Sequence, residues 1–262
     1  MWQLSMTLIQ VGVWRRGQNI EFVWLDMEHK PQKFCTTIEM LAEAKNKILI
    51  CLASKQKIHL SFITAISPHQ IWTKSILLPQ QLNEQECEQQ CQFLLEQELS
   101  IPLSNLWFDY YADMVQQGFQ LTLFAVQKSI AQQYLTELSV LNIDVLDNLA
   151  HTILRAFQFL MPTVQSINTL FLYQDEQSCI ALEEQRYQIL VLQKAHSDLT
   201  ALYTQFCERY EHQPKQVIVY RIHAQDVLPP DWTELHTTLP IIALGSALWG
   251  KRLSNELSEI QK

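Results

Sequence analysis

Residues 8–25 have the sequence LIQVGVWRRGQNIEFVWL, and this stretch determines how the first half of the chain begins. Leu8 to Trp14 is an apolar run typical of a buried strand, and Ile20 to Leu25 is a second run of the same kind. Between them, Arg15-Arg16-Gly17-Gln18 contains a glycine, which favours a tight turn. The stretch therefore predicts a β-hairpin.

Strands and helices follow one another through the rest of the first half. The expected elements are a helix near Ile38–Ala44, strands near Ile48–Ala53, Ile58–Ile63 and Ile71–Leu77, a helix from Asn83, a strand pair Leu106–Tyr111 and Phe119–Gln127, and helices beginning at Ser129 and Asp147. The helix at Asn83 has Glu86 three residues later, which is the spacing of a capping box. Its apolar residues recur at helical spacing and predict a buried face: Cys87, Cys91, Leu94, Leu95 and Leu99.

The second half repeats this order of strands and then helices. Three short strands are expected at Leu170–Tyr173, Cys179–Leu182 and Tyr187–Leu192, followed by a helix capped by Ser197-Asp198, a strand Gln216–Tyr220, and a tail helix Ile241–Leu257. Met161-Pro162 separates the two halves. Two successive series of strands and helices predict an α/β protein with two related halves.

Composition excludes several classes of protein. Of the 262 residues, 48% are hydrophobic and 18% are charged, so a substantial core can form. The net charge of -8 argues against direct nucleic-acid binding, which requires a basic surface. No apolar run is long enough to span a bilayer, and Met1–Val13 lacks the basic start of a signal peptide. These features predict a cytoplasmic protein.

The sequence contains no motif of a known catalytic or metal site. The six cysteines form no CxxC pair, and Cys87 and Cys91 are interpreted as small apolar residues on a buried helix face, with half a metal site as the alternative. There is no Gly-x-Ser-x-Gly and no HExxH. Only five glycines occur, and none forms a GxGxxG or P-loop motif. We therefore expect no catalytic residues, no metal and no cofactor.

Three ordered stretches resemble a known family. In the first, a strand ending in Leu78-Pro79 leads to an acidic helix, then Ile101-Pro102, then Trp107-Phe108-Asp109-Tyr110. The second, Leu121–Phe157, contains LTLFAVQK, and the third is ALGSAL at Ala243–Leu248. In this order they resemble the PilM family of type IV pilus assembly proteins, and within it most closely the competence protein A group of bacterial transformation.

The resemblance implies an actin-like, ribonuclease-H-like fold of two lobes. Residues 1–161 would form the first lobe, with a PilM-type subdomain inserted at about 78–142. Residues 162–262 would form a second lobe that is shorter than in the family, because one subdomain that forms a wall of the nucleotide cleft is missing.

The chain departs from the family where the family binds ATP. The family's two Asp-x-Gly phosphate loops correspond here to the turns at Trp14 and Asp175. The first lacks the aspartate and has the bulky Trp14, and the second keeps an acid but has no glycine. The family's Gly-Gly turn is replaced by Arg221–Asp226. Without glycines the backbone N–H groups have no ready approach to a phosphate. We therefore predict that nucleotide binding is lost, with weak ATP binding or hydrolysis as the alternative.

The resemblance also implies a partner. PilM proteins bind the cytoplasmic N-terminal tail of a PilN-like single-pass inner-membrane protein in a groove beside the inserted subdomain, together with other platform proteins. The implied groove residues are Leu77, Leu78, Phe93, Leu94, Ile101, Pro102, Trp107, Tyr110 and Phe124. The alternative is that most of these side chains form the subdomain's own core. The expected function is a non-enzymatic scaffold of a pilus or DNA-uptake platform, held at the membrane by its partners; a type II secretion platform component is the other candidate.

Overall fold

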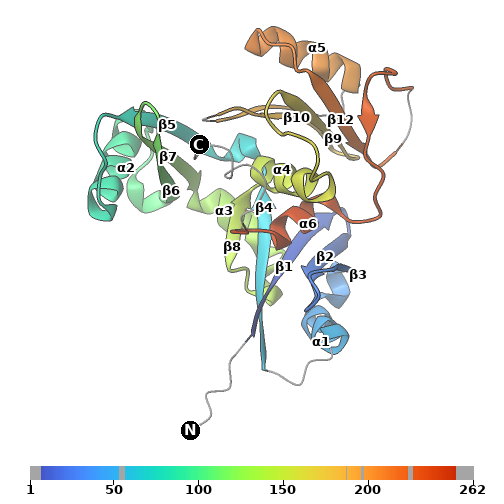
Figure 1. The fold of residues 1–262 in the computed structure, drawn as a ribbon. Coiled ribbons are helices and arrows are strands. Elements are labelled where there is room, and N and C mark those ends of the chain that lie inside the picture. Colours follow the sequence, from blue (N-terminus) through green and yellow to red (C-terminus); the bar gives the residue numbers. More distant parts are fainter. Residues whose placement is uncertain (1–6, 53–56, 187, 196–197, 224–226, 252–262) are drawn as a thin grey trace. The chain divides into compact units, whose positions relative to one another are not determined.

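The computed structural model describes residues 7–52, 57–186, 188–195, 198–223 and 227–251, and Figure 1 shows their secondary structure. The chain divides into two compact units. Unit 1 contains the described residues up to Ala65 and from Ser139 onward, whereas unit 2 is the continuous segment Ile66–Leu138. The domain boundaries predicted from the sequence, at 78, 142 and 161, remain predictions. No helix in the described ranges is long and apolar enough to cross a membrane.

Unit 1 contains two five-stranded sheets. The first has the order β3-β2-β1-β4-β8 and is made of β1 (Thr7–Arg16), β2 (Asn19–Leu25), β3 (Pro31–Thr37), β4 (Ile58–Ile66) and β8 (Val145–Asn148). β1 to β3 form an antiparallel meander, and β4 is parallel to β1. The predicted hairpin is confirmed as β1 and β2, and Gly17 at φ 61° occupies its turn.

The second sheet has the same arrangement. Its order is β11-β10-β9-β12-β13, from β9 (Thr169–Gln174), β10 (Ser178–Glu184), β11 (Ile189–Ala195), β12 (Gln216–Arg221) and β13 (Thr233–Glu234). Again the first three strands are antiparallel neighbours and the fourth is parallel to the first. The two halves predicted from the sequence thus contain the same strand order.

Some of the sequence-based assignments in unit 1 are wrong, and some of its strands were not predicted. The segment expected as a strand at Ile48–Ala53 belongs to helix α1 (Leu41–Leu52), with Ala53 outside the described residues. Leu41, Ala44 and Ile48 are buried at helical spacing, whereas Ile50 is 75% exposed, so the apolar run is not a buried strand. Strand β3 was not predicted because it has no apolar residues at every second position, and only Thr36 of its side chains is buried. Strand β8 was missed because Asp147, in that strand, was expected to begin a helix, which starts at Leu149 instead.

Two helices form the centre of unit 1. They are α4 (Leu149–Leu160) and α6 (Ile241–Ala247), which pack against each other, and α6 also contacts β1 and β2 (Figure 1). Their apolar side chains share one core with both sheets, and the core includes Val23, Phe157, Phe171 and Leu244. Helix α5 (Leu199–Tyr210), capped by Asp198, covers a separate core on the second sheet.

Two glycines allow α6 to pack this closely. A Cβ on Gly12 in β1 would lie 1.8 Å from the carbonyl oxygen of Ala243, and one on Gly245 in α6 would lie 1.8 Å from the carbonyl oxygen of Thr152. Arg155 of α4 also donates a hydrogen bond from Nε to the carbonyl oxygen of Gly245 at 3.1 Å. The Ala-Leu-Gly sequence therefore serves helix packing. α6 ends earlier than the predicted tail helix, whose last residues, 252–257, lie outside the described part of the chain.

Unit 2 is a three-stranded antiparallel sheet covered on one face by a helix. The sheet order is β5-β7-β6, from β5 (Trp72–Leu78), β6 (Leu106–Val115) and β7 (Gly118–Gln127). Helix α2 (Glu84–Glu98) has the predicted capping box between Asn83 and Glu86. Its buried residues Cys87, Cys91, Leu94 and Leu95 pack on the sheet, which confirms the apolar-face interpretation. Helix α3 (Lys128–Thr136) has Gln127 at its N-cap, so Ser129 lies in its first turn and is not the cap.

Candidate functional site

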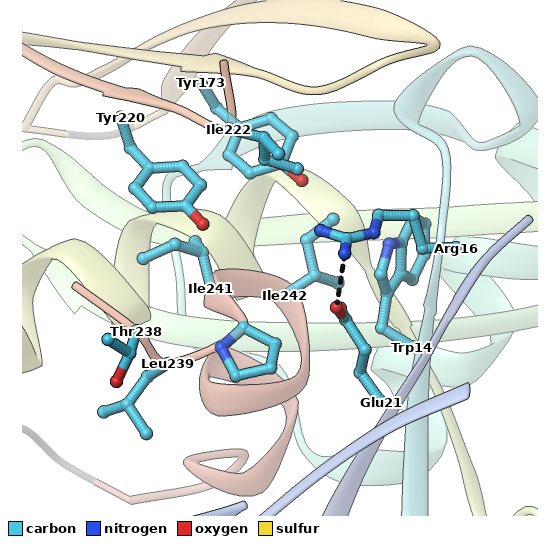
Figure 2. Close-up of a pocket in the computed structure, with 11 residues that line it drawn as sticks. Trp14, Arg16, Glu21, Tyr173, Tyr220, Ile222, Thr238, Leu239, Ile241 and Ile242 are labelled. Atoms are coloured by element: carbon cyan, nitrogen blue, oxygen red, sulfur yellow. Dashed lines mark ion pairs between the residues drawn. The ribbon is translucent and has the colours of Figure 1, made fainter. Parts of the chain in front are cut away.

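The position at which the family resemblance predicts a nucleotide cleft contains a small cavity in unit 1. Its volume is about 140 Å³, below the roughly 300–1,000 Å³ of ordinary small-molecule sites. Residues from the first hairpin, the second sheet and the start of α6 form its walls (Figure 2). The lining residues are Trp14, Arg16, Glu21, Tyr173, Tyr220, Ile222, Thr238, Leu239, Pro240, Ile241 and Ile242.

Side chains connect the two hairpins at this cavity. Arg16, at the end of β1, lies 3.4 Å from Glu21 of β2 and 3.9 Å from Glu176, which belongs to the turn between β9 and β10. Figure 2 shows the Arg16–Glu21 pair beside Trp14. His223 lies 3.4 Å from the same Glu176 oxygen. The two turns that would hold phosphates in the family are therefore joined by one ion pair of the protein itself, Arg16–Glu176.

Asp175 stabilises its own turn. Its Oδ1 accepts hydrogen bonds from the backbone N–H groups of Gln177 (2.9 Å) and Ser178 (2.8 Å), and its Oδ2 accepts one from the Tyr173 hydroxyl (3.2 Å). Those two N–H groups point at a carboxylate in the way that a phosphate loop points its N–H groups at a phosphate. The only acid that the family motif shares with this turn is thus engaged locally.

Burial and negative charge shape the electrostatics of the cavity. Burial raises the pKa of Glu21 above its ordinary value, and the Arg16 guanidinium opposes this shift. Burial also raises the pKa of Tyr173 well above 10; this ring stacks on Tyr220 with centroids 5.7 Å apart. A phosphate entering here would meet the carboxylates of Glu21, Asp175 and Glu176 with one arginine to offset them. This distribution of charge favours ion pairs between the protein's own side chains and disfavours the binding of an anion.

The groove residues predicted in unit 2 lie on more than one surface. Leu78, Leu94, Ile101 and Tyr110 pack towards the core under α2, as the alternative interpretation expected. Tyr110 also donates a hydrogen bond from its hydroxyl to the carbonyl oxygen of Glu84 at 3.1 Å.

The remaining predicted groove residues are more accessible. Leu77 and Trp107 are 51% and 39% exposed and, with Phe124, lie on the sheet face opposite α2 by strand alternation. Phe93 is 53% exposed on the outer side of α2, and Pro102 is exposed before a short 3-10 helix. The structure places Leu77, Trp107 and Phe124 on one face of the sheet, with Leu77 and Trp107 at opposite ends of it, and does not place all nine residues in one groove.

One exposed aromatic residue was not among the groove residues predicted from the sequence. Tyr111 is 45% exposed, and its ring centroid lies 5.9 Å from that of Phe124. It belongs to the same face as Trp107, because residues two apart on a strand point the same way. The alternation of Trp107, Asp109 and Tyr111 along the strand is the sequence pattern that could have predicted the exposure of Tyr111.

The cysteine pair on α2 is part of the core of unit 2. Cys87 and Cys91 are buried among apolar residues of the sheet. Burial raises the pKa of Cys91 to about 11, which disfavours the thiolate that binds metals. Within the residues that the structure describes, no group of three or more His, Cys, Asp or Glu side chains is arranged to hold a metal ion.

No family model and no curated protein matches the sequence. Solved structures do match. One is the cytoplasmic domain of EpsL, an inner-membrane component of the type II secretion system of Vibrio cholerae, with TM-score 0.53 and 12% identity over 93% of this chain and 98% of that chain. Another is the PilM-PilN type IV pilus biogenesis complex, with TM-score 0.52 and 14% identity over 81% of each chain.

At these identities the likeness establishes the fold. Together with the repeated strand order of the two five-stranded sheets, it confirms the predicted α/β, actin-like fold class. The chain has the fold shared by these two platform proteins.

Proposed function

We propose that this chain is a non-enzymatic scaffold on the cytoplasmic side of an inner-membrane assembly platform, of the kind that builds type IV pili or takes up DNA. The observation that carries the proposal is the Arg16–Glu176 contact, which joins the two hairpins beside the cavity, within a fold shared with the pilus and secretion proteins. Such a protein acts through what it holds in place, not through turnover of a bound nucleotide.

Loss of ATP binding follows from the residues of the two turns. Nucleotide binding in water-excluded sites depends on N–H groups, cations and metal ions that face the phosphates. Here the N–H groups of Gln177 and Ser178 are bonded to Asp175, and Gly12 is covered by α6. Trp14 lines the remaining space. A 140 Å³ cavity with these walls offers no preorganised phosphate site.

The partner in this proposal is a PilN-like single-pass inner-membrane protein, bound through its cytoplasmic tail. Leu77, Trp107, Tyr111 and Phe93 supply exposed apolar area on unit 2, and aromatic residues of this kind are enriched at protein interfaces. Binding of this tail and of other platform proteins would hold the chain at the cytoplasmic face of the inner membrane. In this proposal residues 1–161 carry the partner surface, and the shorter second lobe, 162–262, supports it.

A type II secretion platform is the second candidate. The specific observation in its favour is coverage: the match extends over 98% of the EpsL cytoplasmic domain, compared with 81% of the matched chain of the PilM-PilN complex. The two candidates share the scaffold role and differ in the membrane protein that is bound.

Two titrations of the full chain test the proposal. Calorimetry with millimolar ATP and magnesium should show no saturable heat, and the melting temperature should not move, because ligand binding to the native state would raise it. An ATP-binding actin-like protein serves as the positive control. Micromolar ATP affinity accompanied by phosphate release would overturn the scaffold proposal.

The second titration identifies the platform. Cytoplasmic tail peptides of the single-pass membrane proteins encoded near this chain's gene, from pilus and secretion systems alike, are added in turn. We expect saturable binding of one tail and none of its scrambled version. Failure of every such tail would count against both platform assignments, and binding of a secretion tail alone would replace the first candidate with the second.

A further inference from the structure

Unit 2 carries most of the net negative charge of the chain. Residues 66–138 contain eight acidic and two basic residues, a net charge of -6 out of the -8 of the whole chain, with histidine neutral. Both basic residues are already engaged: Lys74 pairs with Glu98 at 3.0 Å, and the Lys128 ammonium donates to the carbonyl oxygen of Ser104 at 2.6 Å. The unit therefore presents a surplus of carboxylates to any partner.

Part of this charge alternates with aromatic rings along one strand. Trp107, Asp109, Tyr111 and Asp113 occupy every second position of β6, and all four are exposed. We call these four residues the β6 stripe. The intervening Leu106, Phe108 and Tyr110 face the core under α2, so the stripe lies on the opposite face of the sheet.

The edge of β6 is partly blocked against pairing with another strand. β6 is a terminal strand of the three-stranded sheet in the described chain. The backbone N–H of Tyr110 donates to Asp109 Oδ1, and that of Met114 donates to Asp113 Oδ1, each at 2.8 Å. An incoming strand would have to displace these carboxylates. A partner at this position must therefore be recognised mainly by side chains.

The side chains of the stripe select for positive charge. A lysine or arginine can lie over a tryptophan or tyrosine face and pair with a neighbouring carboxylate. Among the described residues, no lysine or arginine forms an ion pair with Asp109 or Asp113. Since alternate residues of extended chains repeat about every 6.6–6.8 Å, an extended peptide with basic residues at every second position matches the stripe.

We propose that the β6 stripe binds a lysine- or arginine-bearing extended segment, namely the part of the membrane partner's cytoplasmic tail closest to the bilayer. Cytoplasmic segments next to transmembrane helices are enriched in lysine and arginine, which gives the charge complementarity. This inference rests on the proposed function for the source of the segment, and it adds the surface and the chemistry that recognise it.

The test uses the full chain and two labelled peptides. One has arginine alternating with threonine, and the other has glutamine in place of each arginine. Fluorescence anisotropy should show binding of the arginine peptide that weakens as salt rises, and no binding of the glutamine peptide. Asp109→Asn with Asp113→Asn should weaken binding about fivefold, and Trp107→Ala about tenfold.

A matched control distinguishes the loss of contacts with the β6 stripe from a general loss of negative charge on unit 2. Glu88→Gln with Glu96→Gln removes two exposed carboxylates from α2 in the same unit and should leave the affinity unchanged. Melting temperatures close to that of the parent chain show that each variant is folded. Equal weakening by the two double variants, or binding of the glutamine peptide, would overturn the stripe as the site.

The membrane partner's own tail distinguishes this inference from the proposed function. A tail that binds the parent chain and loses affinity in the stripe variants supports both. Binding that is insensitive to the stripe variants overturns the inference and leaves the scaffold proposal standing. If the arginine peptide binds the stripe while no platform tail binds, the stripe stands and the proposed function fails.

Discussion

Gly12 shows how one residue can have a structural role that its sequence context conceals. It precedes the first turn, where the family resemblance implies a phosphate loop, yet its missing side chain is required by α6. The Ala243 carbonyl and the Ala247 nitrogen lie 1.8 Å and 2.5 Å from where a Cβ would stand. Backbone atoms cannot rotate away as a flexible side chain can, so this contact fixes the distance between β1 and α6.

Gly12→Ala should therefore destabilise the chain by about 2–3 kcal/mol, the upper part of the range for overpacked cores. Urea unfolding followed by circular dichroism measures the change. The matched control is Gly17→Asn, at φ 61° with no atoms within 4 Å, where asparagine tolerates the left-handed conformation and the loss should stay below about 1 kcal/mol. Similar losses in the two variants would contradict the packing role of Gly12.

At the residue scale, the sequence predicted which turns depart from the family but not what they contact. Trp14, in β1 before the first turn, lines the cavity, and Asp175, in the second turn, accepts a hydrogen bond from Tyr173 beside it. The Arg16–Glu176 ion pair joins segments far apart in sequence, and no local pattern encodes such a contact. Tyr111 was missed for a different reason: the family resemblance singled out Tyr110, whose side chain lies on the buried face of the strand.

At the scale of elements, helices and strands were predicted best where the local sequence preference and the tertiary packing favour the same structure. The capping box at Asn83 and the spacing from Cys87 to Leu95 predicted α2 because the same residues that favour the helix also bury its face. The Ile48–Leu52 run is β-branched in part and favoured a strand, whereas burial of Leu41 and Ala44 made it helical. Polar edge strands such as β3 give no hydrophobic period to detect.

One partly buried ion pair links β12 to β13 in addition to their backbone pairing. Arg221 donates to both carboxylate oxygens of Glu234, from Nε at 2.7 Å and from Nη2 at 3.1 Å. The hydrogen bonds from Arg221 lower the pKa of Glu234 below its ordinary 4.5. A carboxyl group with a lowered pKa contributes stability above the unfolded value, and this contribution is lost as the pH falls through 4.5 towards the folded value.

Glu234→Gln should accordingly cost about 1–2 kcal/mol at pH 7, because charge-assisted hydrogen bonds are lost. The difference from the parent chain should shrink as the pH falls below 4.5, which urea unfolding at several pH values measures. Asp231→Asn removes a charge from an exposed position nearby and should give a smaller change at pH 7. A penalty for Glu234→Gln that persists unchanged at acid pH would contradict the ion-pair account.

At the scale of the molecule, the division into a discontinuous unit 1 and a continuous unit 2 predicts separate local stabilities. Leu95→Ala removes a fully buried side chain from unit 2, and Phe157→Ala does so in unit 1, each costing about 2–5 kcal/mol. Native-state hydrogen exchange should accelerate within 66–138 for the first variant and outside that segment for the second. Uniform acceleration along the chain in both variants would show a single cooperative unit instead.

The sequence predicted the fold class better than it predicted how the chain divides into compact units. Two series of strands and helices indicated related halves, and the identical strand orders confirm them. The compact unit Ile66–Leu138 could not be delimited from the sequence, because no glycine- or proline-rich linker marks its ends.

The packing of α6 against β1 has a consequence for the order of events during synthesis. The hairpin of β1 and β2 is translated well before α6, because it ends at Leu25 whereas the helix that covers Gly12 begins only at Ile241. Unit 2, being continuous, can fold while translation proceeds. The nascent first sheet meanwhile exposes Val23, which lies opposite Gly12 and is fully buried in the core that it shares with α6. The first sheet can therefore bury this face completely only after α6 has been translated.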